Sequence, residues 1–296
     1  MSETVLDVRS IAVGNQLADR LIQQHLKTRD KRSSALKRRG ASAGLLFFVG
    51  DSWFNYFSHD VRDLLSERGH ATRTVAEPGA SLADIAASRS SRQLRDLLQL
   101  IEEAASANHA PKAILLSGGG NDVAGDGFHK LLTDVNQGLP PLNDAIVAAT
   151  INGTMRTALE QILTQMTRFC QTFLGAPVPI LLHGYAYPVP DGRGLGWDVG
   201  SVAGPWLAPG FVQKGYLDLE QRKAIMKDLI DRLHEMQTGA HGVTAMPGFE
   251  HVSHVDLRDT LSTGPDYKEW WENELHPRLQ GFERITEKLA ERIEAL

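Results

Sequence analysis

The sequence predicts an α/β fold, a three-layer α/β/α sandwich around a five-stranded parallel sheet. Two observations support this prediction. Short apolar segments alternate with longer segments of helical periodicity, and three of the short segments are continuously apolar, as strands covered on both faces are. The chain has 296 residues, of which 42% are hydrophobic and 23% charged, so it can bury a substantial core.

The expected strands and helices alternate along most of the chain. The strands are expected at residues 45–49, 71–75, 113–116, 178–182 and 252–255. Helices are expected at residues 8–26, 54–68, 81–104, 143–174, 217–237 and 279–295. Gly69 is a plausible helix stop and Ser81 a plausible N-cap, which supports these boundaries.

Two segments lie outside this alternation. Residues 1–40 are expected to form a helical and basic N-terminal extension to a domain that spans residues 41–296, and their basic run is interpreted as a solvated helix end and linker. Residues 184–216 lack helical periodicity and are rich in proline, glycine and aromatic residues. A loop of this length is usually functional, so we expect a cap or wall of a substrate pocket.

Composition excludes several classes of function. The net charge of −5 gives no reason to expect a nucleic-acid partner, and no apolar run approaches the roughly 18 residues of a membrane span. The N-terminus lacks the pattern of a secretory signal, so a cytoplasmic location is expected. Cys170 is the single cysteine and has no disulfide partner in the chain. We expect no cofactor and no metal, because the glycine-rich runs lack nucleotide-binding spacing and His251 and His254 face opposite sides of a strand.

Four residues that could take part in catalysis lie in turns of the kind where an α/β sheet binds its ligands. Ser52 follows the first expected strand in the run LLFFVGDSW, and Gly79 follows the second. Asn121 follows the third strand, and His276 precedes the last helix, with Pro277 suited to its first turn. A serine hydroxyl needs a base to take its proton and donors to hold an oxyanion, and these residue types supply both.

These motifs resemble those of the GDSL-type, or SGNH, hydrolase superfamily, whose four sequence blocks are centred on Ser, Gly, Asn and His. The matching residues are Gly50-Asp51-Ser52, Gly79, Gly119-Gly120-Asn121-Asp122 and His276-Pro277, and the resemblance spans about residues 44–290. It implies a flavodoxin-like strand order. It further implies a serine esterase that hydrolyses small-molecule carboxylic esters through an acyl-enzyme intermediate.

The resemblance also implies a role for each matched residue. Ser52 would be the nucleophile and His276 its base. The backbone N–H groups of Ser52 and Gly79 and the side-chain amide of Asn121 would form the oxyanion hole. Asp51 and Asp122 are expected to brace their turns.

One position departs from the family pattern, which usually has an aspartate three residues before the histidine. Asn273 stands there. An amide can orient an imidazole but cannot offset the imidazolium charge. We expect Asn273 to orient His276, while Glu272, Glu274, Asp266 and a backbone carbonyl remain alternatives.

Aromatic residues near these turns are candidates for the substrate pocket, namely Trp53, His183, Tyr185 and Trp206. The same site would also serve a thioesterase or an acyltransferase. The competing class is a degenerate SGNH fold that acts as a binding module. In that case, Asn273 in place of the aspartate would indicate that catalytic activity has been lost.

Overall fold

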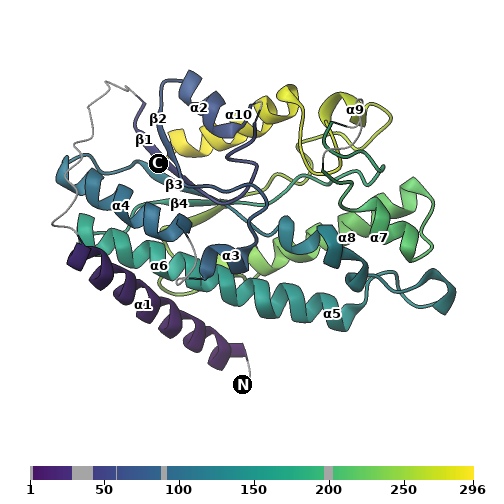
Figure 1. Ribbon diagram of the computed structural model, residues 1–296, viewed down its shortest axis with the longest axis horizontal. Coiled ribbons are helices and arrows are strands. Elements are labelled where there is room, and N and C mark those ends of the chain that lie inside the picture. Colours follow the sequence, from purple (N-terminus) through teal and green to yellow (C-terminus); the bar gives the residue numbers. More distant parts are fainter. Residues whose placement is uncertain (1–2, 29–42, 58, 88–91, 197–202) are drawn as a thin grey trace.

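Five parallel strands form one sheet in the order β2-β1-β3-β4-β5, as the computed structural model shows for residues 3–28, 43–57, 59–87, 92–196 and 203–296 (Figure 1). The strands are β1 (Leu45–Val49), β2 (Ala71–Thr74), β3 (Ala113–Ser117), β4 (Ile180–His183) and β5 (Val252–Val255). The predicted fold class is confirmed, including the flavodoxin-like order. Every expected strand is present within two residues of its expected bounds.

Helices cover both faces of the sheet. They are α1 (Glu3–Thr28), α2 (Val61–Glu67), α3 (Leu82–Ala86), α4 (Arg92–Ser106), α5 (Asp144–Ala148), α6 (Arg156–Leu174), α7 (Ala208–Gln213), α8 (Leu219–Thr238), α9 (Tyr267–Trp270) and α10 (Leu279–Glu294). Helices α2 and α10 pack together on one face, while α4 and α6 pack together on the other (Figure 1). Helix α1 lies against the outer side of α6 (Figure 1).

The sheet owes its position in the middle layer to the apolar character of its central strands. All residues of β1, β3 and β4 are buried, which agrees with their continuously apolar sequences. The edge strand β2 is only partly buried. Because the strands are parallel, the residues that follow β1, β3 and β4 meet at one edge of the sheet.

The N-terminal helix α1 packs on the same core as the sheet. Its buried residues Ala18, Leu21 and Ile22 belong to the continuous hydrophobic cluster. Gly14 allows close approach, because a Cβ there would lie 2.8 Å from the Cβ of Thr164 in α6. Most of the basic run lies at residues 29–42, outside the described residues. In the part of the chain that the structure describes, no helix is both long enough and apolar enough to cross a membrane.

The helices expected at 54–68 and 81–104 were wrong in extent. The helix expected at 54–68 begins only at Val61, because the Asp60 side chain caps its N-terminus by accepting from Asp63 N–H, and residues 54–57 are not helical. The helix expected at 81–104 is divided into α3 and α4, since α3 ends at Ala86. The helix expected at 143–174 is present as a continuous helical stretch of α5, the π-helical segment Ala149–Met155 and α6.

The segment 184–216 includes the short helix α7 and an isolated bridge between Leu195 and Ala203. Its residues 197–202 lie outside the described residues.

Candidate active site

The turn that carries Ser52 follows β1 directly and depends on Gly50. This residue has φ +139°, and a Cβ there would lie 2.2 Å from the carbonyl oxygen of Ser117 at the end of β3. Only glycine fits such a close approach of two strands. The buried Gln93 amide accepts from Gly50 N–H and donates to Gly50 C=O, both at 2.9 Å, so the backbone before Ser52 is held on both sides.

Asp51 fixes the same turn from beneath. Its carboxylate is 1% exposed and accepts from Trp53 N–H at 3.0 Å, from the Ser117 hydroxyl at 2.6 Å and from the Tyr185 hydroxyl. These three donors come from the turn itself, from the end of β3 and from the segment after β4. Asp51 therefore ties the Ser52 turn to the end of β3 and to the segment after β4.

The structure brings Ser52, His276 and Asn273 into one hydrogen-bonded chain. Ser52 Oγ lies 2.8 Å from His276 Nε2, and Asn273 Oδ1 lies 3.0 Å from His276 Nδ1. The same amide oxygen accepts from the backbone N–H groups of Leu275 at 3.0 Å and His276 at 2.9 Å. Because these donors require an acceptor, the oxygen end of the amide faces the ring. Nδ1 then carries the proton, and Nε2 accepts from the Ser52 hydroxyl.

The His276 ring is almost enclosed by its neighbours. The residue is 8% exposed, and its ring stacks on that of Tyr56 with centroids 4.4 Å apart and an interplanar angle of 17°. The Trp206 ring packs edge-on against it, with ring centroids 5.7 Å apart and an interplanar angle of 72°. Burial lowers the pKa of His276 to about 4, because the charged imidazolium is disfavoured away from water. The imidazole is therefore neutral at pH 7, as a general base must be.

The other groups considered as partners of His276 are engaged elsewhere. The buried carboxylate of Glu274 accepts from four backbone N–H groups, those of Gly192, Trp206, Leu207 and Ala208. Asp266 accepts from the Ser262 hydroxyl and the Trp270 indole. Glu272 interacts with the Tyr56 side chain. Among these residues, Asn273 is the one whose side chain meets His276 Nδ1.

The residues expected to form an oxyanion hole lie on the turns after β1, β2 and β3. Gly79 has φ +80°, a conformation that glycine adopts without strain. Within the described residues, neither the N–H of Ser52 nor that of Gly79 donates to another protein group. The Asn121 amide donates one N–H to the carbonyl of Ala80 at 3.0 Å, which fixes this side chain beside the Gly79 turn. The amide has a second N–H to offer a ligand.

Asp122 fixes the next element of the same edge. Its carboxylate accepts from Leu82 N–H at 2.9 Å, at the start of α3. Ser81 caps this helix by a capping box with Asp84. Burial raises the pKa of Asp122 to about 6. Asp122 therefore links the turn after β3 to the turn after β2, which carries Gly79.

Three of the four aromatic residues expected in the pocket are buried beneath the site. Trp53 donates its indole N–H to the carbonyl of Leu275 at 3.1 Å and stacks on His183, which is fully buried. Trp53 and Tyr185 also line an apolar cavity of about 30 Å³. Trp206 is half-buried and lies against His276. Trp53, His183 and Tyr185 thus support the floor of the site, while Trp206 forms part of its wall.

Sequence reasoning missed Tyr56, Gln93 and the contacts of Glu274. Tyr56 lies four residues after Ser52, but the expected helix at 54–68 would have carried it elsewhere. Glu274 was considered only as a partner of His276. Its actual partners lie 66 to 82 residues away in the chain, and no local pattern marks such a pairing.

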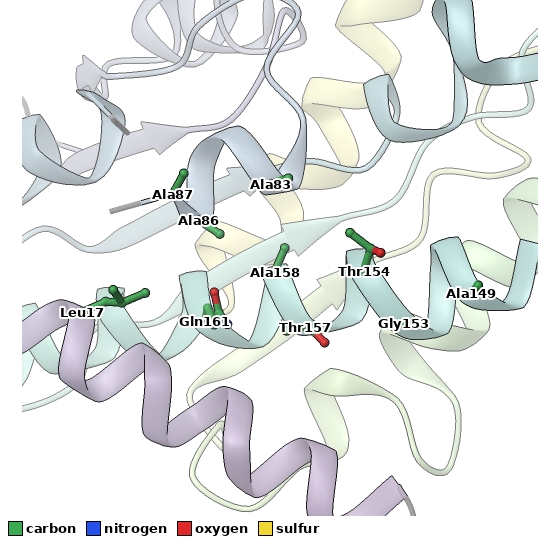
Figure 2. A pocket seen from close by; sticks show the side chains of 10 residues that line it. All are labelled: Leu17, Ala83, Ala86, Ala87, Ala149, Gly153, Thr154, Thr157, Ala158 and Gln161. Atoms are coloured by element: carbon green, nitrogen blue, oxygen red, sulfur yellow. The ribbon is translucent and has the colours of Figure 1, made fainter. Parts of the chain in front are cut away.

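A larger hollow lies away from this site. It has a volume of about 730 Å³ and lies between α1, α3 and the helical residues 149–161 (Figure 2). Small side chains such as Ala83, Ala86 and Ala158 leave this space open, and its lining contains no nucleophile paired with a base. Within the described ranges, no three His, Cys, Asp or Glu side chains are grouped so as to hold a metal ion.

Comparison with known proteins finds similarity at the level of fold. No family model matches the chain, and no curated protein is significantly similar to it. Among solved structures, TesA is 16% identical with a TM-score of 0.42, over 85% of this chain and 98% of that one. An acetylxylan esterase from Geobacillus stearothermophilus is 13% identical with a TM-score of 0.39, over 87% of this chain and 96% of that one. LAE5, an alpha/beta hydrolase enzyme from the metagenome of Lake Arreo, Spain, is 14% identical with a TM-score of 0.45, over 86% and 96%.

Proposed function

We propose that this protein is a serine esterase that hydrolyses small-molecule carboxylic esters through an acyl-enzyme intermediate. The observation that carries the proposal is the hydrogen-bonded chain from Ser52 Oγ through His276 to Asn273, at 2.8 Å and 3.0 Å. A serine, a neutral imidazole and an orienting acceptor in this order are the parts that nucleophilic acyl transfer requires. The proposed reaction uses neither a cofactor nor a metal.

Acylation begins with the Ser52 hydroxyl. Its proton moves to His276 Nε2 as Oγ bonds to the ester carbonyl carbon, and the carbonyl oxygen becomes an oxyanion. The N–H groups of Ser52 and Gly79 and the amide of Asn121 are the donors proposed for that oxyanion. The tetrahedral intermediate then expels the alkoxide, which takes the proton from His276 and leaves as an alcohol.

Deacylation repeats these steps with water. Water gives a proton to His276 Nε2 and attacks the acyl carbon of the Ser52 ester. The second tetrahedral intermediate collapses, the carboxylic acid leaves, and the proton returns to Ser52 Oγ. The Nδ1 proton stays on the ring throughout, held by Asn273 Oδ1.

The same geometry also suits a thioesterase, an acyltransferase or a binding module. These alternatives differ in the acyl donor, in the group that accepts the acyl chain, or in whether an acyl-enzyme forms at all. A thioesterase would accept thioesters, and an acyltransferase would let an alcohol replace water. A binding module would form no acyl-enzyme. The buried Ser52–His276 hydrogen bond favours the enzyme over the binding module, since binding alone gives no reason to keep a nucleophile beside a neutral base.

The test is hydrolysis of p-nitrophenyl esters from acetate to laurate by the wild type and by Ser52→Ala, together with labelling by a fluorophosphonate. We expect hydrolysis and labelling that depend on Ser52, with both variants equally folded by circular dichroism. Equal turnover by Ser52→Ala would remove Ser52 from the mechanism. Folded wild-type protein that neither hydrolyses an ester nor takes the label would support a binding module. An added alcohol that captures the acyl group in preference to water would identify an acyltransferase.

A further inference from the structure

The candidate base has to carry a positive charge that its orienting residue does not offset. When Ser52 gives up its proton, His276 becomes an imidazolium at a position that is 8% exposed. The residue at its Nδ1 is the neutral Asn273, and burial already lowers the pKa of His276 to about 4. The other described side chains that hydrogen-bond to the ring or stack on it belong to Ser52, Tyr56 and Trp206, none of which is charged at neutral pH.

Tyr56 presents the face of its ring to this imidazole. The two rings are 4.4 Å apart at their centroids and only 17° from parallel. The π face of an aromatic ring is electron-rich and attracts a cation within about 6 Å of its centroid, most strongly where water is excluded. Tyr56 is 7% exposed, so this contact is shielded from solvent.

The orientation of Tyr56 is held by hydrogen bonds at both ends. Its backbone N–H donates to Asp60 at 3.1 Å, the residue that caps α2. Its hydroxyl accepts from Asn273 Nδ2 at 3.4 Å. Asn273 thus contacts His276 through its oxygen and Tyr56 through its nitrogen, and it fixes the two rings relative to each other.

The charge of the Glu272 carboxylate acts on Tyr56. Glu272 is half-buried, and its backbone N–H donates to the carbonyl of His276 at 2.9 Å. Burial, together with the charge of the Glu272 carboxylate, raises the pKa of Tyr56 above its usual range.

We propose that Tyr56, supported by Glu272, is a positioning residue that stabilises the imidazolium form of His276 through its ring face, in place of a carboxylate at Nδ1. This inference rests on the proposed function, in which His276 takes the Ser52 proton.

The test compares Tyr56→Leu, which removes the ring, with Tyr56→Phe, which keeps it. We expect Tyr56→Leu to lower kcat on p-nitrophenyl acetate about thirtyfold with little change in KM, the size of a desolvated cation–π contact. Tyr56→Phe should retain more of the activity than Tyr56→Leu. Glu272→Gln should also lower kcat, because it removes the charge and leaves the ring. Equal losses in Tyr56→Leu and Tyr56→Phe would overturn the proposal.

A titration separates this role from simple packing. The pKa of His276 is measured by NMR in the Asn273→Asp background, where a carboxylate brings it into an accessible range, with His276→Gln used to assign the signal. Adding Tyr56→Leu should lower this pKa. If the ring only packs, its loss lets water reach His276 and the pKa stays or rises, which would contradict the proposal. The titration needs no substrate, so it decides the question even if the wild type hydrolyses no ester.

Discussion

For the proposed reaction, Asn273→Asp should speed ester hydrolysis above neutral pH. The substitution keeps the size of the side chain and replaces a neutral acceptor 3.0 Å from His276 Nδ1 by a carboxylate. The new charge would be fully buried, as Asn273 is, but three donors already point at it. These are the backbone N–H groups of Leu275 and His276 and the Nδ1–H of His276. The site is therefore prepared to hold a carboxylate.

The magnitude follows from the present pKa of His276, about 4. An opposite charge at this distance raises the pKa of a neighbouring base by about 1–3 units, and each unit corresponds to about 1.4 kcal/mol of imidazolium stabilisation. Because the imidazolium forms in the transition state, realising one unit there would raise kcat about tenfold.

At low pH the effect of Asn273→Asp on activity changes from a gain to a loss. A higher pKa leaves less neutral imidazole below it, so the acid limb of kcat/KM should move upward.

The assay is the pH profile of p-nitrophenyl acetate hydrolysis between pH 4 and 9 for the wild type, Asn273→Asp and Asn273→Ala. The alanine variant is the matched control, since it removes the acceptor and should lose activity across the whole range. A folded Asn273→Asp variant with an unchanged acid limb and no gain at pH 8 would refute the reasoning.

Three further predictions concern the same site. Wild-type hydrolysis should persist well below pH 6 and fall near pH 4, because activity requires neutral His276; an acid limb near 6.5 would contradict its burial. Glu274→Gln should lower the free energy of unfolding by about 2 kcal/mol or more, measured in urea, because an amide nitrogen would face two buried N–H donors. Gly50→Ala should cost at least about 2 kcal/mol, since its φ of +139° and the 2.2 Å approach to Ser117 leave no room for a Cβ; unchanged stability would show that the turn can shift.

The sheet was predictable because its signal is local. Continuously apolar runs mark β1, β3 and β4, and the alternation with helices leads to the parallel arrangement. Helix extents were less predictable, because they depend on single capping contacts. Asp60 starts α2 seven residues later than periodicity suggested, and the residues so released form the turn that carries Tyr56.

The candidate site was predictable to the extent that its residues follow strands. Ser52, Gly79 and Asn121 come after strands of one sheet, so topology predicts that their turns converge. The contacts of His276 with Tyr56 and Trp206 join segments more than 60 residues apart. Such contacts depend on tertiary packing, and sequence spacing carries no information about them.

The four hydrogen bonds to the Glu274 carboxylate predict that an added carboxylate can rescue a variant that lacks this side chain. The four N–H groups that its carboxylate accepts form a receptor of carboxylate size and charge, held by a loop whose Trp206 contacts the candidate base. Glu274→Gly would remove the carboxylate from these four N–H groups and leave the backbone between residue 274 and His276 intact. Free formate should then bind in its place and restore hydrolysis with saturation kinetics, whereas chloride, which cannot bridge four donors with two oxygens, should not. A small anion added to the buffer would then restore both the position of the loop and the activity that depends on His276.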